Sequence, residues 1–182
     1  MRRLISATLL VALLLGLFAG CSTGSEPTEA TTEPPQSSGL SGIEILDNFE
    51  ELLTVSDMSE HYTVTRLPAV DLPDSGETYH AAVITDTLLG DMYHLSVSVD
   101  ASGDATMIDL SADTSGTEYM DFSLFCFYVY LSMGLPEMDA LEFLDAFGLP
   151  SNEPDRSLTV DGWDLWAFHL EDSLFFVATY TD

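Results

Sequence analysis

The sequence predicts an α+β domain in which an antiparallel sheet of six or seven strands packs on two or three helices. Residues 79–85 and 92–100 alternate apolar and polar side chains with the two-residue period of strands. Residues 43–53 repeat apolar side chains at helical spacing. Asp161-Gly162 is a two-residue hairpin signal between two further apolar stretches. Strands and helices are therefore both expected.

The N-terminal part of the domain is expected to form a helix and then an antiparallel meander. The helix, over 43–53, turns Ile43, Leu46 and Phe49 to one face and acidic residues to the other. The spacing of turn residues predicts strands at 61–67, 79–85, 92–100 and 106–110. A loop with a proline at each end is expected over 68–73.

The stretch 118–133 predicts a central helix that is largely buried. From 122 to 131 only Ser123 is polar, so the helix is apolar nearly all round. Its β-branched and aromatic side chains leave a strand as the alternative. A second helix is expected to begin at Pro136 and to end at Gly148.

The last part of the chain predicts three antiparallel strands. They are expected at 158–160, 163–170 and 174–180. The region 138–180, with its helix, Gly-Leu-Pro, hairpin and two tryptophans, resembles β-lactamase-inhibitor-like modules and outer-membrane-assembly lipoproteins. That resemblance implies no functional residue here.

The first 21 residues have the three regions of an export signal. Arg2 and Arg3 precede an apolar run, and Ala19-Gly20 precede Cys21. Residues 17–21 resemble the lipobox of bacterial lipoproteins. The resemblance implies cleavage before Cys21 and a diacylglycerol on its thiol, which anchor the chain to the outer side of the cell membrane. A membrane span or an ordinary cleaved signal are the alternatives, but the apolar run is short for a span.

Three segments follow from this division. Residues 1–20 are the expected signal peptide. Residues 21–41 are expected to be a disordered Ser/Thr/Pro/Glu tether, because they have almost no apolar side chains whose burial could offset the entropy lost on ordering. Residues 42–182 are expected to form one acidic domain, and the apolar fraction of the whole chain, 46%, suffices for a core.

Charge excludes several classes of function. The domain holds 28 of the 31 acidic residues and only Arg66 and Arg156 as fixed cations, a net charge of −26, and the chain has no lysine. Nucleic acid is excluded as a partner because phosphate backbones are bound through Lys and Arg. A protein or a cationic ligand remains possible, beside the membrane itself through the lipid on Cys21.

No motif points to a catalytic residue, a metal site or a cofactor. Pairs such as His94 with Asp91, or His169 with Glu171, are better explained as solvated strand positions. The Asp100-Ala-Ser-Gly-Asp segment lacks the full calcium-loop pattern and predicts a hairpin turn. Cys126 lies in the apolar run and is expected to be an inert core thiol.

Two tryptophans are the candidate partner-binding residues. Trp163 and Trp166 lie three apart in a predicted strand and therefore face opposite sides, so one is expected in the core and one on the surface. The leading hypothesis is a lipid-anchored, extracytoplasmic, non-catalytic interaction domain. The alternatives are an extracytoplasmic hydrolase that uses carboxylates, and an acidic surface that serves salt adaptation only.

Overall fold

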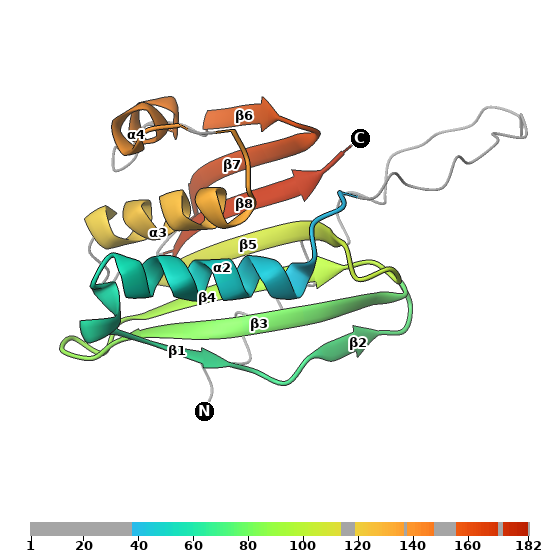
Figure 1. The fold of residues 1–182 in the computed structure, drawn as a ribbon, viewed down its shortest axis with the longest axis horizontal. Helices are drawn as coiled ribbons and strands as arrows, with labels where there is room; N and C mark the ends of the chain where they lie inside the picture. Colours follow the sequence, from blue (N-terminus) through green and yellow to red (C-terminus); the bar gives the residue numbers. More distant parts are fainter. Residues whose placement is uncertain (1–37, 114–118, 137, 148–155, 171–172, 182) are drawn as a thin grey trace, which may run out of the picture. The chain divides into compact units, whose positions relative to one another are not determined.

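The computed structural model describes residues 38–113, 119–136, 138–147, 156–170 and 173–181. The helices of this part are α2 (Gly42–Val55), the short 3-10 helix η1 (Met58–Glu60), α3 (Tyr119–Ser132) and α4 (Ala140–Phe147) (Figure 1). No described helix has both the length and the apolar character needed to cross a membrane.

The strands form a single antiparallel sheet of eight. They are β1 (Tyr62–Arg66), β2 (Val70–Leu72), β3 (Glu77–Asp86), β4 (Met92–Val99), β5 (Ala105–Asp113), β6 (Arg156–Val160), β7 (Trp163–Leu170) and β8 (Ser173–Tyr180). Their order is β1-β3-β4-β5-β8-β7-β6, with β2 also paired to β3. The predicted α+β class, an antiparallel sheet packed on helices, is confirmed.

Two meanders that are distant in the sequence meet in the middle of this sheet. Strand β5, the last of the first meander, pairs with β8, the last strand of the chain, from Met107↔Thr179 to Asp113↔Ser173. Strands β6, β7 and β8 therefore follow outward in reverse order. As a result β1 and β2 form one edge of the sheet, and β6 forms the other.

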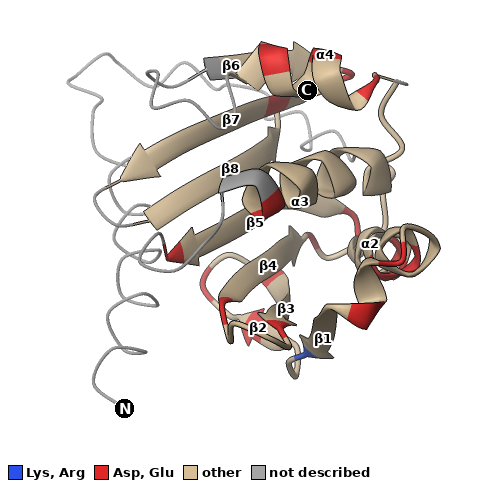
Figure 2. Cartoon of the chain, turned by 90° about the vertical axis from the view of Figure 1, so that its left-hand side faces the viewer, with Lys and Arg blue, Asp and Glu red and all other residues tan. Residues whose placement is uncertain are grey.

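All three α-helices lie on the same face of the sheet (Figure 2). Phe125 of α3 packs edge-on against Tyr93 of β4, with ring centroids 4.7 Å apart. Phe143 of α4 contacts Phe176 of β8 at 6.1 Å. These rings lie in the core, where the side chains are almost fully buried. We call this side of the sheet the helix face.

Gly42 lets the start of α2 lie directly on the sheet. A Cβ at this position would come within 2.3 Å of Cγ1 of Val99 and 3.1 Å of Cγ1 of Val97. Such contacts are closer than packed atoms tolerate. The glycine that opens the helix is therefore required by packing on β4.

The strand count differs from the prediction of six or seven. The additional strand is β2, three residues within the stretch 68–73 that was expected to be a loop. It pairs with the first residues of β3, from Val70↔Tyr79 to Leu72↔Glu77, beyond the end of β1. Prolines at 68 and 73 bound it without lying inside it, as expected for a short edge strand.

Helix α3 is less completely buried than predicted. Phe122, Phe125 and Val129 are at most 1% exposed, but Leu124 and Leu131 are half-buried. The partly exposed positions follow helical spacing and form a narrow stripe turned away from the sheet. The sheet, α2 and α4 thus cover most of the circumference of α3, and one side of the helix stays partly exposed.

Helix α4 begins four residues later than the predicted start at Pro136. Its first turn is capped by Asp139, whose Oδ1 accepts a hydrogen bond of 2.8 Å from the backbone N–H of Glu142. An Asp followed three residues later by Glu is a capping-box pattern, which is a stronger helix start than an isolated proline. The predicted end at Gly148 lies outside the described residues.

The predicted turns are confirmed. Asp161 and Gly162 have φ values of 47° and 76°, the left-handed pair that a type I′ hairpin turn requires. Asp100 Oδ1 accepts hydrogen bonds from the backbone N–H of Ser102 and of Asp104, at 2.8 and 3.1 Å. The segment expected to turn between β4 and β5 is therefore closed by its own aspartate.

Candidate functional site

The sheet has a second face, opposite the helix face, that we call the open face. No described helix or strand covers it. Strand alternation and register place these residues on its central part: Tyr79, Val83, His94, Ser96, Ser98, Met107, Asp109, Ser111, Trp166, Phe168, Phe175 and Val177. The water-facing side of an antiparallel sheet is usually polar. The aromatic residues of the open face distinguish it from such a surface.

Asp109 lies at the middle of the open face. On β5 it pairs with Ser96 of β4 on one side and with Val177 of β8 on the other. The next strand along the same row is β7, where Trp166 pairs with Val177. Since neighbouring strands are about 4.8 Å apart, the backbones at Asp109 and Trp166 are roughly 10 Å apart.

The carboxyl group of Asp109 is shifted toward its neutral form. Burial among its neighbours raises the pKa of Asp109 from 3.8 to about 7, and a hydrogen bond from Ser111 limits the rise. A carboxyl with a pKa near neutrality is half protonated at pH 7. It can therefore donate a hydrogen bond in one state and carry an uncompensated negative charge in the other.

Two further titratable groups of the open face lie near Asp109. Tyr79 is two strands away on β3; burial raises the pKa of Tyr79, a hydrogen bond with Ser96 lowers it, and the charge of Asp109 raises it further. His94 pairs with Ser111 and so lies diagonally from Asp109. Burial lowers the pKa of His94, which keeps the imidazole neutral at pH 7.

Aromatic side chains occupy the open face beside Asp109. Phe168 of β7 and Phe175 of β8 are directly paired and stacked, with ring centroids 5.1 Å apart and planes 14° apart. Trp166, two residues before Phe168, is half-buried on the same face. A polar centre of hydroxyl and carboxyl groups therefore adjoins an aromatic surface.

The two candidate tryptophans point to opposite faces. Trp163 is 1% exposed on the helix face, where its ring contacts Tyr180 at 5.4 Å. Trp166 lies on the open face. Of the two residues proposed for partner binding, only Trp166 is placed to touch a partner.

The remaining candidate residues are distributed as follows. Cys126 is fully buried in α3, and burial raises the pKa of its thiol. Within the described part of the chain, no group of three His, Cys, Asp or Glu side chains is arranged to hold a metal ion. Cys21 and Glu171 lie outside the described residues.

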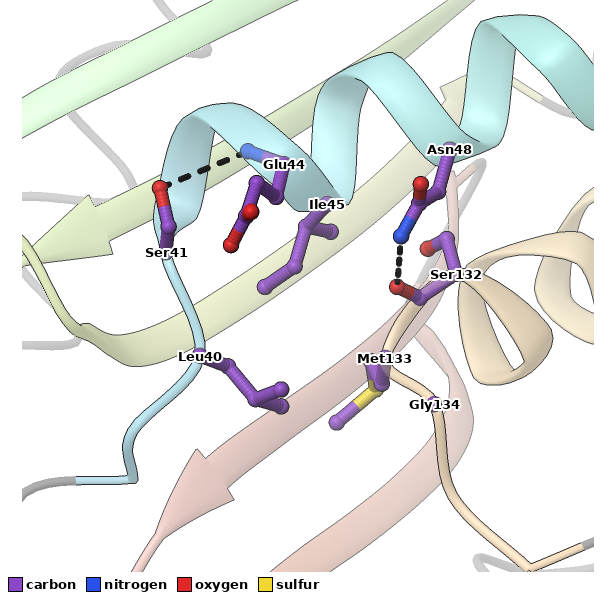
Figure 3. A pocket seen from close by; sticks show the side chains of 8 residues that line it. All are labelled: Leu40, Ser41, Glu44, Ile45, Asn48, Ser132, Met133 and Gly134. Carbon is purple, nitrogen blue, oxygen red and sulfur yellow. Dashed lines mark hydrogen bonds between the residues drawn. The ribbon is translucent and has the colours of Figure 1, made fainter.

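A hollow of about 220 Å³ lies between the start of α2 and the end of α3 (Figure 3). Its polar groups already have partners: Ser41 Oγ accepts from the backbone N–H of Glu44, and the amide of Asn48 donates to the carbonyl of Ser132 at 3.2 Å. Apart from the carboxylate of Glu44, which is exposed, the hollow offers few polar groups to a ligand.

Sequence reasoning identified Trp166 but missed Asp109 and Ser96. The strand 106–110 was predicted, yet its partner β8 comes from the other end of the chain. The available signal was an acidic residue between Ile108 and Leu110, in an otherwise apolar alternation. The chain matches no protein-family model, no curated protein and no solved structure.

Proposed function

We propose that this chain is a lipid-anchored, extracytoplasmic interaction domain that binds a partner protein through the open face of its sheet. The single observation that supports the proposal most is the placement of Trp166, Phe168 and Phe175 on the face that no described helix covers. Trp166 and Phe168 are half-buried, whereas Phe175 is 9% exposed. Partly accessible aromatic groups beside polar side chains are typical of protein-binding surfaces. The lipobox-like residues 17–21 support the anchor.

A second candidate is a hydrolase that uses carboxylates. The observation that favours it is Asp109, since a pKa near 7 suits a general acid. Glycoside hydrolysis by the usual route needs a second carboxyl group, and the two catalytic carboxyl groups are generally about 5–9.5 Å apart. The residues paired directly with Asp109 are Ser96 and Val177, and neither supplies one. Binding therefore remains the better-supported function.

Site-specific photo-crosslinking in living cells tests the binding role. A photoreactive amino acid at Phe168, on the open face, is compared with one at Leu141, a 78% exposed position on α4. A discrete adduct is expected from position 168 and none from 141. Trp166→Ala in the same chain should remove the adduct.

Equal labelling from both positions would show that the open face has no special partner. Trp166→Ala also needs a folding control, which is its thermal unfolding curve. Because Trp166 is half-buried on the outer side of the sheet, the substitution should cost less stability than Trp163→Ala. Hydrolysis that is lost in Asp109→Asn would instead favour the enzyme.

A further inference from the structure

The charge of Asp109 has no counter-ion among the described residues of the open face. Arg66, one of the two fixed cations of the domain, is on β1 and bonded to Asp47 and Glu50 of α2. Arg156 is in β6, three strands away from β5, and the chain has no lysine. Among the described residues, no salt bridge reaches Asp109. Within the part of the chain that the structure describes, no residue therefore supplies a cation to this carboxylate.

The titratable groups around Asp109 do not replace that cation. On β4 the nearest is His94, which is neutral, and on β3 it is Tyr79. The residues of β8 next to Asp109, Phe175 and Val177, do not titrate. Asp113 on β5 is acidic as well.

The open face suits an extended peptide better than a small molecule. Small ligands are bound in concave sites that enclose most of their surface, whereas this face is one side of a sheet that no described element encloses. From Ser96 to Trp166 the row crosses four strands, on the order of 14 Å. This is the span of about four extended residues.

The expected tether supplies no such peptide. The tether, residues 21–41, has three glutamates, no Lys or Arg, and no aromatic side chain. A second copy of the domain carries a net charge of −26 and would be repelled. Charge complementarity therefore favours a different, basic partner, which the net charge would also attract over long range.

We propose that the open face binds an extended segment of a partner protein in which a lysine or arginine lies at Asp109 and apolar neighbours contact Trp166, Phe168 and Phe175. This inference rests on the proposed function, because it names the chemistry of the partner at the same face. Ser96 and Ser111, which flank the carboxyl group, accept the remaining N–H groups of the cation.

The affinity is expected to depend on pH. A cation stabilises ionised Asp109, so binding lowers the pKa of this group and releases a proton near pH 7. Affinity for a basic segment should rise from pH 6 to pH 8. Protonation of His94 would repel the bound cation and so act in the same direction, but only at lower pH, because burial lowers the pKa of this imidazole.

Calorimetric titration of the full-length, exported chain in nonionic detergent tests the inference. The probes are the peptides acetyl-Val-Phe-Lys-Phe-Val-amide and the same peptide with glutamine for lysine. At pH 8 the lysine peptide should bind at least about tenfold more tightly, and the difference should shrink at pH 6. Titrations in buffers of different ionisation enthalpy should reveal proton release.

Asp109→Asn should abolish both the lysine preference and the proton release. Glu51→Gln, an equal change of charge on the outer side of α2, should retain them. Thermal unfolding checks that both variants fold. Equal binding of the two peptides, a preference that survives Asp109→Asn, or no binding of either peptide would overturn the inference. A specific adduct at position 168 would even then leave the proposed function standing.

Discussion

Arg66 and Glu50 form a direct link between the edge strand β1 and helix α2. The guanidinium Nε of Arg66 lies 2.5 Å from Oε1 of Glu50, and its Nη2 lies 2.6 Å from Oδ1 of Asp47. One cation thus holds two carboxylates that repel each other. The domain has a net charge of −26 and only two arginines, and one of these arginines binds two carboxylates.

Arg66→Met should destabilise the domain at low salt. All three side chains are more than a third exposed, so the expected loss is about 1 kcal/mol in the free energy of unfolding. The loss should shrink in 1 M NaCl because salt screens the repulsion between Asp47 and Glu50. Urea unfolding measures it, and Arg66→Lys should recover part of it. Equal stability of wild type and Arg66→Met at low salt would contradict a stabilising link.

Asp109 should make stability fall as pH rises. Its pKa is about 7 in the folded chain against 3.8 normally, so the folded state holds a proton that the unfolded state has lost between about pH 4 and 7. The contribution is complete below pH 4 and lost above pH 7. Asp109→Asn should therefore be more stable than wild type at pH 8, by on the order of a few kcal/mol, and about equal at pH 4. Denaturant unfolding at several pH values measures the difference, with Glu51→Gln as the control.

The N-terminal limit of the domain can be tested by two truncations. Leu40 accepts a backbone hydrogen bond of 2.7 Å from Ala105, and Ser41 caps α2 and bridges to Asp104. Removal of residues 1–37 should leave the unfolding free energy nearly unchanged. Removal of residues 1–41 should cost about 1–2 kcal/mol through the lost cap. Equal stability of the two shortened chains would show that these contacts contribute nothing.

Cys21→Ser should abolish the membrane anchor. If Cys21 carries the lipid, the variant should stay uncleaved or leave the membrane fraction, whereas the control Cys126→Ala should behave as wild type because that thiol is buried in α3. Membrane fractionation and the apparent mass of the product provide the measurement. A Cys21→Ser variant that is processed and retained normally would contradict the lipobox interpretation.

Salt should stabilise the domain by screening its acidic surface. The Debye length falls from about 10 Å at 0.1 M to about 3 Å at 1 M, so repulsion among 28 carboxyl groups weakens. Thermal unfolding in NaCl and in CaCl₂ at equal ionic strength separates screening from binding. Equal melting temperatures are expected. A clear excess with calcium would instead reveal a specific cation site.

Local signals in the sequence predicted most of the elements. The pair Asp161-Gly162 determines a hairpin through the left-handed conformation that both residues adopt, so β6 and β7 were predictable. Strand β2 was not, because the four residues between Pro68 and Pro73 show too little alternation to distinguish a strand from a loop. The start of α4 depends on one side-chain cap at Asp139, which competed with the proline signal at 136.

The candidate site was less predictable than the fold. Its centre exists because β5 pairs with β8, and no turn joins those strands or fixes their register. Local alternation places Asp109 on one side of β5 but does not show that Val177 and Trp166 lie beyond it. Trp166 was found in advance as one of a pair, since its spacing from Trp163 already requires opposite faces, and Phe168 and Phe175 were predicted to lie near it.

The two arginines of the domain stand one on each outermost strand, Arg66 in β1 and Arg156 in β6. Trypsin cuts after Lys or Arg, so it has two sites between residue 22 and the end of the chain, both within hydrogen-bonded strands. Digestion of the native protein should therefore leave it whole. After denaturation it yields a central peptide of 90 residues, from 67 to 156, too long for routine peptide mass spectrometry. Proteases that cut at acidic or aromatic residues are the suitable reagents for detecting it.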